Sequence, residues 1–112
     1  MADRQSLGKE GEVIAARFLT EKKYELIEKN YRYGHGEIDL IVKKDNILIF
    51  VEVKFRSCSA FGYPEESVRS AKRKKVLDTA EAFIAQINWK SDIRFDIVAI
   101  TGKEVEHFED AF

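Results

Sequence analysis

Residues 37–55 read EIDLIVKKDNILIFVEVKF, and this stretch decides the fold. Two apolar runs flank Asp45-Asn46, and both of these residue types tolerate left-handed backbone angles. The pattern therefore predicts a hairpin with strands at 37–44 and 47–55. Because the second run is apolar at almost every position, we expect that strand to lie centrally in a sheet covered on both faces.

The two-residue turn also predicts the register of the hairpin. It places Asp39 opposite Glu52 and Glu37 opposite Lys54. Directly opposed side chains have Cβ atoms roughly 4.5–5.5 Å apart, and like charges at that spacing are destabilising. Alternation along the strands predicts that Asp39 shares a face with Ile41, Glu52 and Lys54. The fold must therefore offset the repulsion between two carboxylates.

Two interpretations of this charged end of the hairpin are open. A close carboxylate pair can hold a hard divalent cation, which removes the repulsion. The adjacent Lys54 could then orient a water or stabilise charge developing on a phosphate, which is the equipment for phosphodiester hydrolysis. In the alternative, Lys54 neutralises Glu52 and Glu37 in an ion-pair network without metal.

Hydrophobic periodicity and turn signals predict the elements outside the hairpin. They comprise helices over 6–23 and 64–88, strands over 25–33 and 93–101, and a short acidic tail over 106–112. The order α-β-β-β-α-β predicts an α/β fold with a mixed central sheet flanked by helices. Because the chain shows no repeat or linker, we expect a single domain over residues 1–112.

Composition excludes several classes of protein. The chain is 45% hydrophobic and 35% charged, which is typical of a globular domain and not of a disordered one. The single cysteine, Cys58, excludes a disulfide framework, and with no apolar leader we expect a cytoplasmic location. The longest apolar run, residues 47–51, is too short to span a bilayer, so we expect no membrane role.

Charge is unevenly distributed although the net charge is only −1. Residues 69–75 hold five cations and no anion, and they are interpreted either as phosphate contacts or as a solvated helix face. If they bind DNA, the affinity should fall steeply with salt. The candidate nucleic-acid contacts along the whole chain are Arg32, Arg56, Lys72, Arg73 and Lys75.

The hairpin resembles a known group of enzymes. GEIDLI at 36–41 and FVEVKFR at 50–56 are similar to the D…ExK core of restriction-endonuclease-like nucleases, with Ile38 where the nominal PD-(D/E)xK motif has proline. The whole chain resembles the YraN family of small bacterial proteins. The other residues that carry this resemblance are GKEGE at 8–12, Asn30, Arg32, Lys72, RFD at 94–96, His107, Ala111 and Phe112.

The resemblance implies a restriction-endonuclease-like core and a Mg²⁺- or Mn²⁺-dependent nuclease related to Holliday-junction resolvases. Asp39 and Glu52 would be metal ligands and Lys54 the catalytic lysine. Glu12 in the first helix matches the family's further carboxylate ligand, with Glu10 in reserve because helical periodicity hardly separates the two.

The same resemblance implies DNA, in branched or junction form, as the partner, and a homodimer, since two strands need two cuts. An alternative hypothesis is a nucleic-acid-binding or partner-docking module that keeps the nuclease fold without catalysis. A third is a thiol enzyme centred on Cys58.

Overall fold

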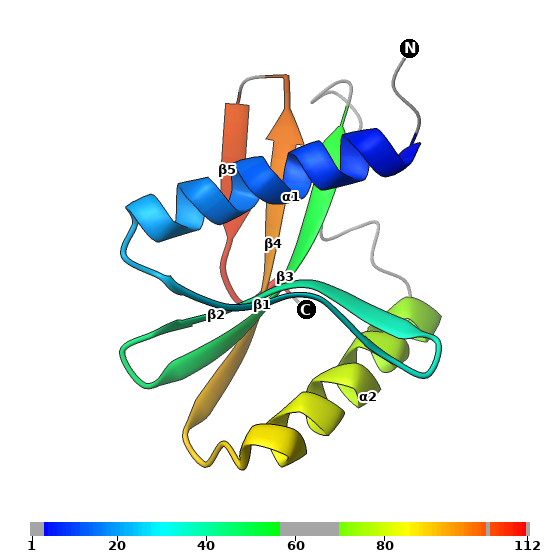
Figure 1. Ribbon diagram of the computed structural model, residues 1–112, viewed down its shortest axis with the longest axis vertical. Coiled ribbons are helices and arrows are strands. Elements are labelled where there is room, and N and C mark those ends of the chain that lie inside the picture. The colour runs from blue at the N-terminus through cyan, green and yellow to red at the C-terminus, as the bar shows by residue number, and fades with distance from the viewer. Residues whose placement is uncertain (1–3, 57–69, 103, 112) are drawn as a thin grey trace.

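A five-stranded mixed sheet with one helix packed on each face makes up the fold (Figure 1). The computed structural model describes residues 4–56, 70–102 and 104–111. The elements in chain order are α1 (Arg4–Glu21), β1 (Glu25–Tyr33), β2 (Gly36–Lys44), β3 (Ile47–Arg56), α2 (Ser70–Ile87), β4 (Asp92–Thr101) and β5 (Glu104–Phe108). This arrangement confirms the predicted α/β class and is consistent with the endonuclease-like core.

The sheet order is β1-β2-β3-β4-β5, so β3 is the central strand, as predicted. β3 runs parallel to β4, and all other neighbours are antiparallel. The predicted acidic tail was wrong, because residues 104–108 form β5 along β4. Exposed Glu104 and Glu106 alternate there with half-buried Val105 and His107, a period of two that the run of charges obscured.

The hairpin register is confirmed over Leu40–Lys44 and Ile47–Val51, and Asp45 takes the left-handed angle that the turn requires (φ 53°). Beyond Leu40 and Val51 the two strands separate. β2 continues against β1, while β3 continues against β4. The ladder therefore stops before the two charged pairs that the sequence placed opposite each other. We call this point the fork.

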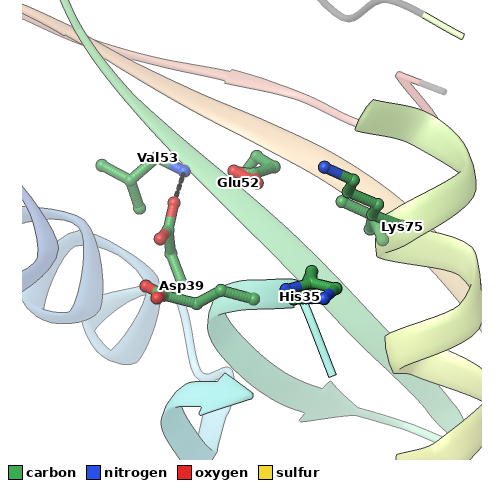
Figure 2. A pocket seen from close by; sticks show the side chains of 8 residues that line it. His35, Asp39, Glu52, Val53 and Lys75 are labelled. Carbon is green, nitrogen blue, oxygen red and sulfur yellow. Dashed lines mark hydrogen bonds between the residues drawn. The ribbon is translucent and has the colours of Figure 1, made fainter. Parts of the chain in front are cut away.

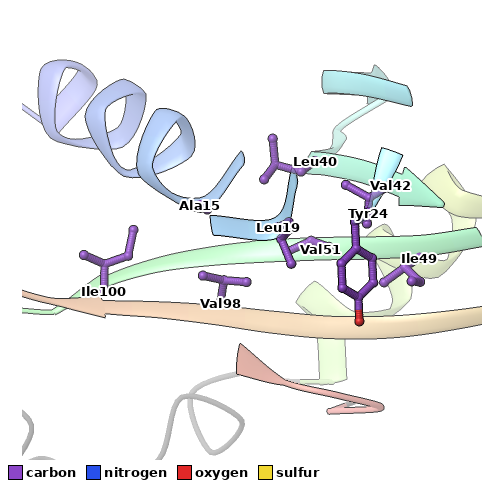
Figure 3. Close-up of a cluster of buried hydrophobic side chains, with 9 residues drawn as sticks. All are labelled: Ala15, Leu19, Tyr24, Leu40, Val42, Ile49, Val51, Val98 and Ile100. Carbon is purple, nitrogen blue, oxygen red and sulfur yellow. The ribbon is translucent and has the colours of Figure 1, made fainter. Parts of the chain in front are cut away.

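Two apolar clusters hold the helices on the sheet. Ala15 and Leu19 of α1 pack on one face, in a cluster completed by Tyr24, Leu40, Val42, Ile49, Val51, Val98 and Ile100 (Figure 3). The opposite face packs Ile38, Ile41, Leu48 and Phe50 against Val76, Ala80 and Phe83 of α2. Ile38 and Ile41 are three residues apart yet share this cluster, so strict alternation fails where β2 turns away from β3.

Two predictions involve residues 57–69, which lie outside the described residues. They are the thiol-enzyme hypothesis centred on Cys58 and the expected start of the second helix at residues 64–69. The described helices α1 and α2 are neither long nor apolar enough to cross a membrane.

Candidate active site

A cavity of about 310 Å³ opens at the fork, between the first residues of β2, the middle of β3 and α2 (Figure 2). Its polar lining comes from the turn before β2, from both separating strands and from the helix. The lining includes His35, Glu37, Asp39, Glu52, Lys75 and Val76. Strands that separate leave room for side chains that a continuous ladder would exclude.

Asp39 occupies the fork itself. Its Oδ2 accepts a hydrogen bond from the backbone N–H of Val53 at 2.8 Å, so the carboxylate takes the place of a missing strand partner. Burial, together with the charge of Glu52, raises the pKa of Asp39 from 3.8 to about 7. A hydrogen bond from Asp39 to Glu52 contributes to this rise, so Asp39 favours its protonated form when no cation is present.

A second group of acidic side chains meets Asp39 from the α1 side. Carboxylate oxygens of Glu12, Glu37 and Asp39 lie within 4.8 Å of one another, and all three residues are half-buried. Burial raises the pKa of Glu12 above its usual 4.5; the Asn30 side chain opposes this through a hydrogen bond, while Asp39 and Glu37 add to it. Three carboxylates at this spacing form an oxygen donor set that suits a hard cation such as Mg²⁺.

Close packing of α1 on β3 brings Glu12 to this position. Gly11 is buried, and a Cβ there would stand 3.2 Å from the Phe55 ring and 3.6 Å from Val53. Glycine at position 11 therefore suits the close contact between α1 and β3. Glu10 is exposed and does not belong to the acidic group, so the structure favours Glu12 over its reserve.

Glu37 lies beyond the end of the β2–β3 ladder, so its predicted position opposite Lys54 is wrong. It lies opposite Arg32 of β1, and its carboxylate pairs with that side chain at 2.8 Å. The cause is the fork, which carries β2 away from β3 before Glu37. Sequence reasoning missed Glu37 as a neighbour of Asp39, although a spacing of two residues on one strand was a usable signal. It also left Asn30, whose side chain bonds Glu12, without a firm role.

The predicted site residues therefore assemble only in part. Asp39 and Glu52 line the cavity, while Glu12 lies against Asp39 on the α1 side. Lys54 is half-buried on β3, opposite Ala99 of β4.

The candidate DNA contacts are spread over three elements. Arg32 is exposed apart from its ion pair with Glu37, and Arg73 is exposed on α2. Lys75 lines the cavity. Arg56 ends β3 and Lys72 lies in α2, but both side chains fall outside the described part of the chain.

A separate buried acid, Asp96 on β4, provides an electrostatic contrast. Arg94 donates to both of its oxygens at 2.8 Å, and Nε2 of His107 of β5 lies 2.7 Å from Oδ2. Burial alone would raise the pKa of Asp96, but the hydrogen bonds from His107, Arg94 and the Asp110 N–H hold it below 3.8. The Asp96 carboxylate is therefore fully hydrogen-bonded, and its contacts with His107 and the Asp110 N–H hold β5 and the residues after it against β4.

The fold and the acidic cavity thus define an endonuclease-like α/β protein with a candidate cation site. The chain belongs to a family described as "Uncharacterised protein family UPF0102", which matches residues 11–100 and is the YraN-like group.

Three relatives named UPF0102 protein illustrate the match. The chain is 50% identical over 95 residues to the one from Cytophaga hutchinsonii, covering 85% of this chain and 84% of the relative. It is 43% identical over 109 residues to the one from Thermodesulfovibrio yellowstonii, covering 97% of each. It is 39% identical over 116 residues to the one from Christiangramia forsetii, covering 100% and 98%.

Proposed function

We propose that this chain is a Mg²⁺- or Mn²⁺-dependent endonuclease that hydrolyses phosphodiester bonds in DNA. The observation that carries the proposal is the state of Asp39. A carboxyl with a pKa raised to about 7, beside Glu52 and within 4.8 Å of two further carboxylates, is unfavourable unless a cation or a proton joins the group. A divalent cation relieves this repulsion at the point where the D…ExK pattern expects one.

The chain's own residues divide the work of the reaction. Asp39, Glu52 and Glu12 would hold the cation. The carboxylates of Glu12, Glu37 and Asp39 lie within 4.8 Å of one another, and Glu52 lines the same cavity as Asp39. A cation bound there supplies a Lewis acid for the phosphate and lowers the pKa of its water. Lys54, on the same face of β3 as Glu52 by alternation, stabilises negative charge developing on the phosphate oxygens.

The substrate class follows from the resemblance and from the surface. The exposed cations Arg32 and Arg73 can contact phosphates, which position a protein on DNA without reading its sequence. We therefore expect branched or junction DNA, recognised by shape, and a homodimer that cuts two strands in the cytoplasm.

The test is cleavage of labelled junction, flap and duplex DNA by the purified protein in Mg²⁺ and in Mn²⁺. We expect Lys54→Ala and Asp39→Asn each to lower kcat by roughly a hundredfold or more while DNA affinity changes little, because the lost interactions act on the transition state. Glu106→Gln, an exposed carboxylate change on β5, is the matched control and should keep wild-type activity.

Two outcomes would contradict the nuclease proposal. Cleavage that survives both substitutions belongs to a contaminant. Tight DNA binding without cleavage in either metal supports the alternative, a binding module that keeps the nuclease fold.

A further inference from the structure

Helix α2 approaches β2 unusually closely at Gly36. A Cβ at this position would meet the Thr79 hydroxyl and would stand 2.7 Å from the backbone oxygen of Lys75. Gly36 has no positive φ, so the glycine is required by the close approach and not by its backbone angle. Thr79 is fully buried, and its Oγ1 donates to the same Lys75 oxygen at 2.7 Å. Because Gly36 allows α2 to approach this closely, the backbone of Lys75 lies beside the cavity, and the Thr79 hydroxyl bonds the Lys75 oxygen from within the same helix.

The side chain of Lys75 makes use of this placement. It extends from α2 into the cavity and directs its amine towards Glu52, from the wall opposite Asp39 (Figure 2). Within residues 4–56, 70–102 and 104–111, Lys75 forms no ion pair, whereas the neighbouring Val76 is buried in the α2 cluster. Arg73 and Lys74 are exposed on the same helix but do not line the cavity. Of the three cations in the run whose side chains the structure describes, Lys75 is thus the one that lines the cavity.

We infer that Lys75 binds a non-bridging oxygen of a phosphate group in this cavity, and that Gly36 and Thr79 are the positioning residues that hold it there. The identification of that phosphate as a DNA phosphodiester rests on the proposed function. Glu37, Asp39 and Glu52 would repel a phosphate, so the anion needs cations on both sides of it. The metal held by the carboxylates supplies one, and Lys75 supplies the other as a mobile point charge.

The first test measures phosphate binding without cleavage. Thymidine 5′-monophosphate is titrated calorimetrically into the wild-type protein, Lys75→Ala and Lys75→Arg in saturating Mg²⁺. Lys90→Ala is the matched control, because it removes an exposed lysine beyond the end of α2. We expect Lys75→Ala to weaken binding by roughly 10- to 100-fold, as for a charge-assisted hydrogen bond, and Lys75→Arg to retain most of it. Equal affinities for Lys75→Ala and Lys90→Ala would overturn the inference.

The second test asks whether Thr79 acts through Lys75. Thr79→Val removes the hydrogen bond to the Lys75 oxygen, whereas Thr79→Ser keeps it and should preserve phosphate affinity. In a double-mutant cycle, Thr79→Val should weaken binding in the wild type but add nothing in the Lys75→Ala background. Additive losses would show a merely structural role for Thr79 and overturn that part of the inference.

The two proposals fail in different ways. If phosphate binding depends on Lys75 but no DNA is cut, the nuclease proposal fails and the phosphate site stands. If DNA is cut and Lys75→Ala behaves like Lys90→Ala in both binding and cleavage, the inference about Lys75 fails and the nuclease proposal stands.

Discussion

Replacing Asp39 with Asn should stabilise the metal-free protein. Burial and the Glu52 charge raise the pKa of Asp39 from 3.8 to about 7. Because the pKa in the folded protein lies above the unfolded value, the folded state holds more protons between these two pH values, and stability falls as pH rises through that window. Asn is neutral at every pH, and its side-chain oxygen can still accept the Val53 N–H.

The size of the effect follows from the two pKa values. A rise from 3.8 to about 7 corresponds to roughly 4 kcal/mol when Asp39 is fully ionised in both states. Near pH 8 almost all of this penalty is present, whereas near pH 5 about 2 kcal/mol remains. The free energy of unfolding gained by Asp39→Asn should therefore be about 2.5 kcal/mol larger near pH 8 than near pH 5, or roughly 10 °C in Tm.

Urea denaturation in a chelator, at about pH 5 and about pH 8, measures this difference. Asp92→Asn, an exposed change at the start of β4, is the matched control and should show no such dependence. A gain that is the same at both pH values, or a loss of stability near pH 8, would refute the reasoning, because either result means that Asp39 carries no ionisation penalty.

Three further predictions concern the cation, the β5 anchor and the core. Saturating Mg²⁺ should stabilise the wild-type protein by about 2.7 kcal/mol at a hundredfold excess over Kd, and it should stabilise Glu37→Gln less. Thermal unfolding measures both effects, and an unchanged Tm of the wild-type protein would exclude the cation site. Asp96→Ala should cost about 3–5 kcal/mol in the free energy of unfolding, because Arg94 and His107 lose a buried counter-charge. Since the pKa of Asp96 is held below 3.8, the stability from its ionisation is complete above 3.8 and is lost as pH falls through the folded-state pKa, a loss that acid titration should find absent from the variant. Leu19→Ala should lower the free energy of unfolding, measured by urea denaturation, by about 2–5 kcal/mol because it leaves a cavity in the core. The affinity for Mg²⁺ should not change, and a change would mean that the core is coupled to the site.

Local signals predicted the hairpin well. The turn at Asp45 depends on residue types that accept its backbone angle, and the central place of β3 depends on its unbroken apolar run. Both properties belong to short stretches of chain, so the sequence expresses them directly. The carboxylates Asp39 and Glu52 were found for the same reason, since they interrupt an apolar pattern.

The fork could not be predicted from these signals. Past Leu40 and Val51, β2 stays paired with β1 and β3 stays paired with β4, so the point at which β2 leaves β3 is a property of the whole sheet. The wrong placement of Glu37 opposite Lys54 has this cause, because the predicted β2–β3 ladder was extended past its last pair, Leu40 with Val51. The place of Lys75 was equally hidden, since only the contact of Gly36 with α2 distinguishes it from the other cations of the basic run.

The hydrogen bond from Val53 to Asp39 has a consequence for judging which relatives are active. The strand needs an acceptor at position 39 because β3 has lost its neighbour there, whether or not any chemistry takes place. A descendant that gave up catalysis would still be under pressure to keep Asp or Asn at this position. An oxygen at position 39 is therefore not by itself a sign of activity. Under the proposed nuclease function, loss of catalysis in a relative should be sought in Asn at position 39 and in substitutions of Glu52 and Lys54.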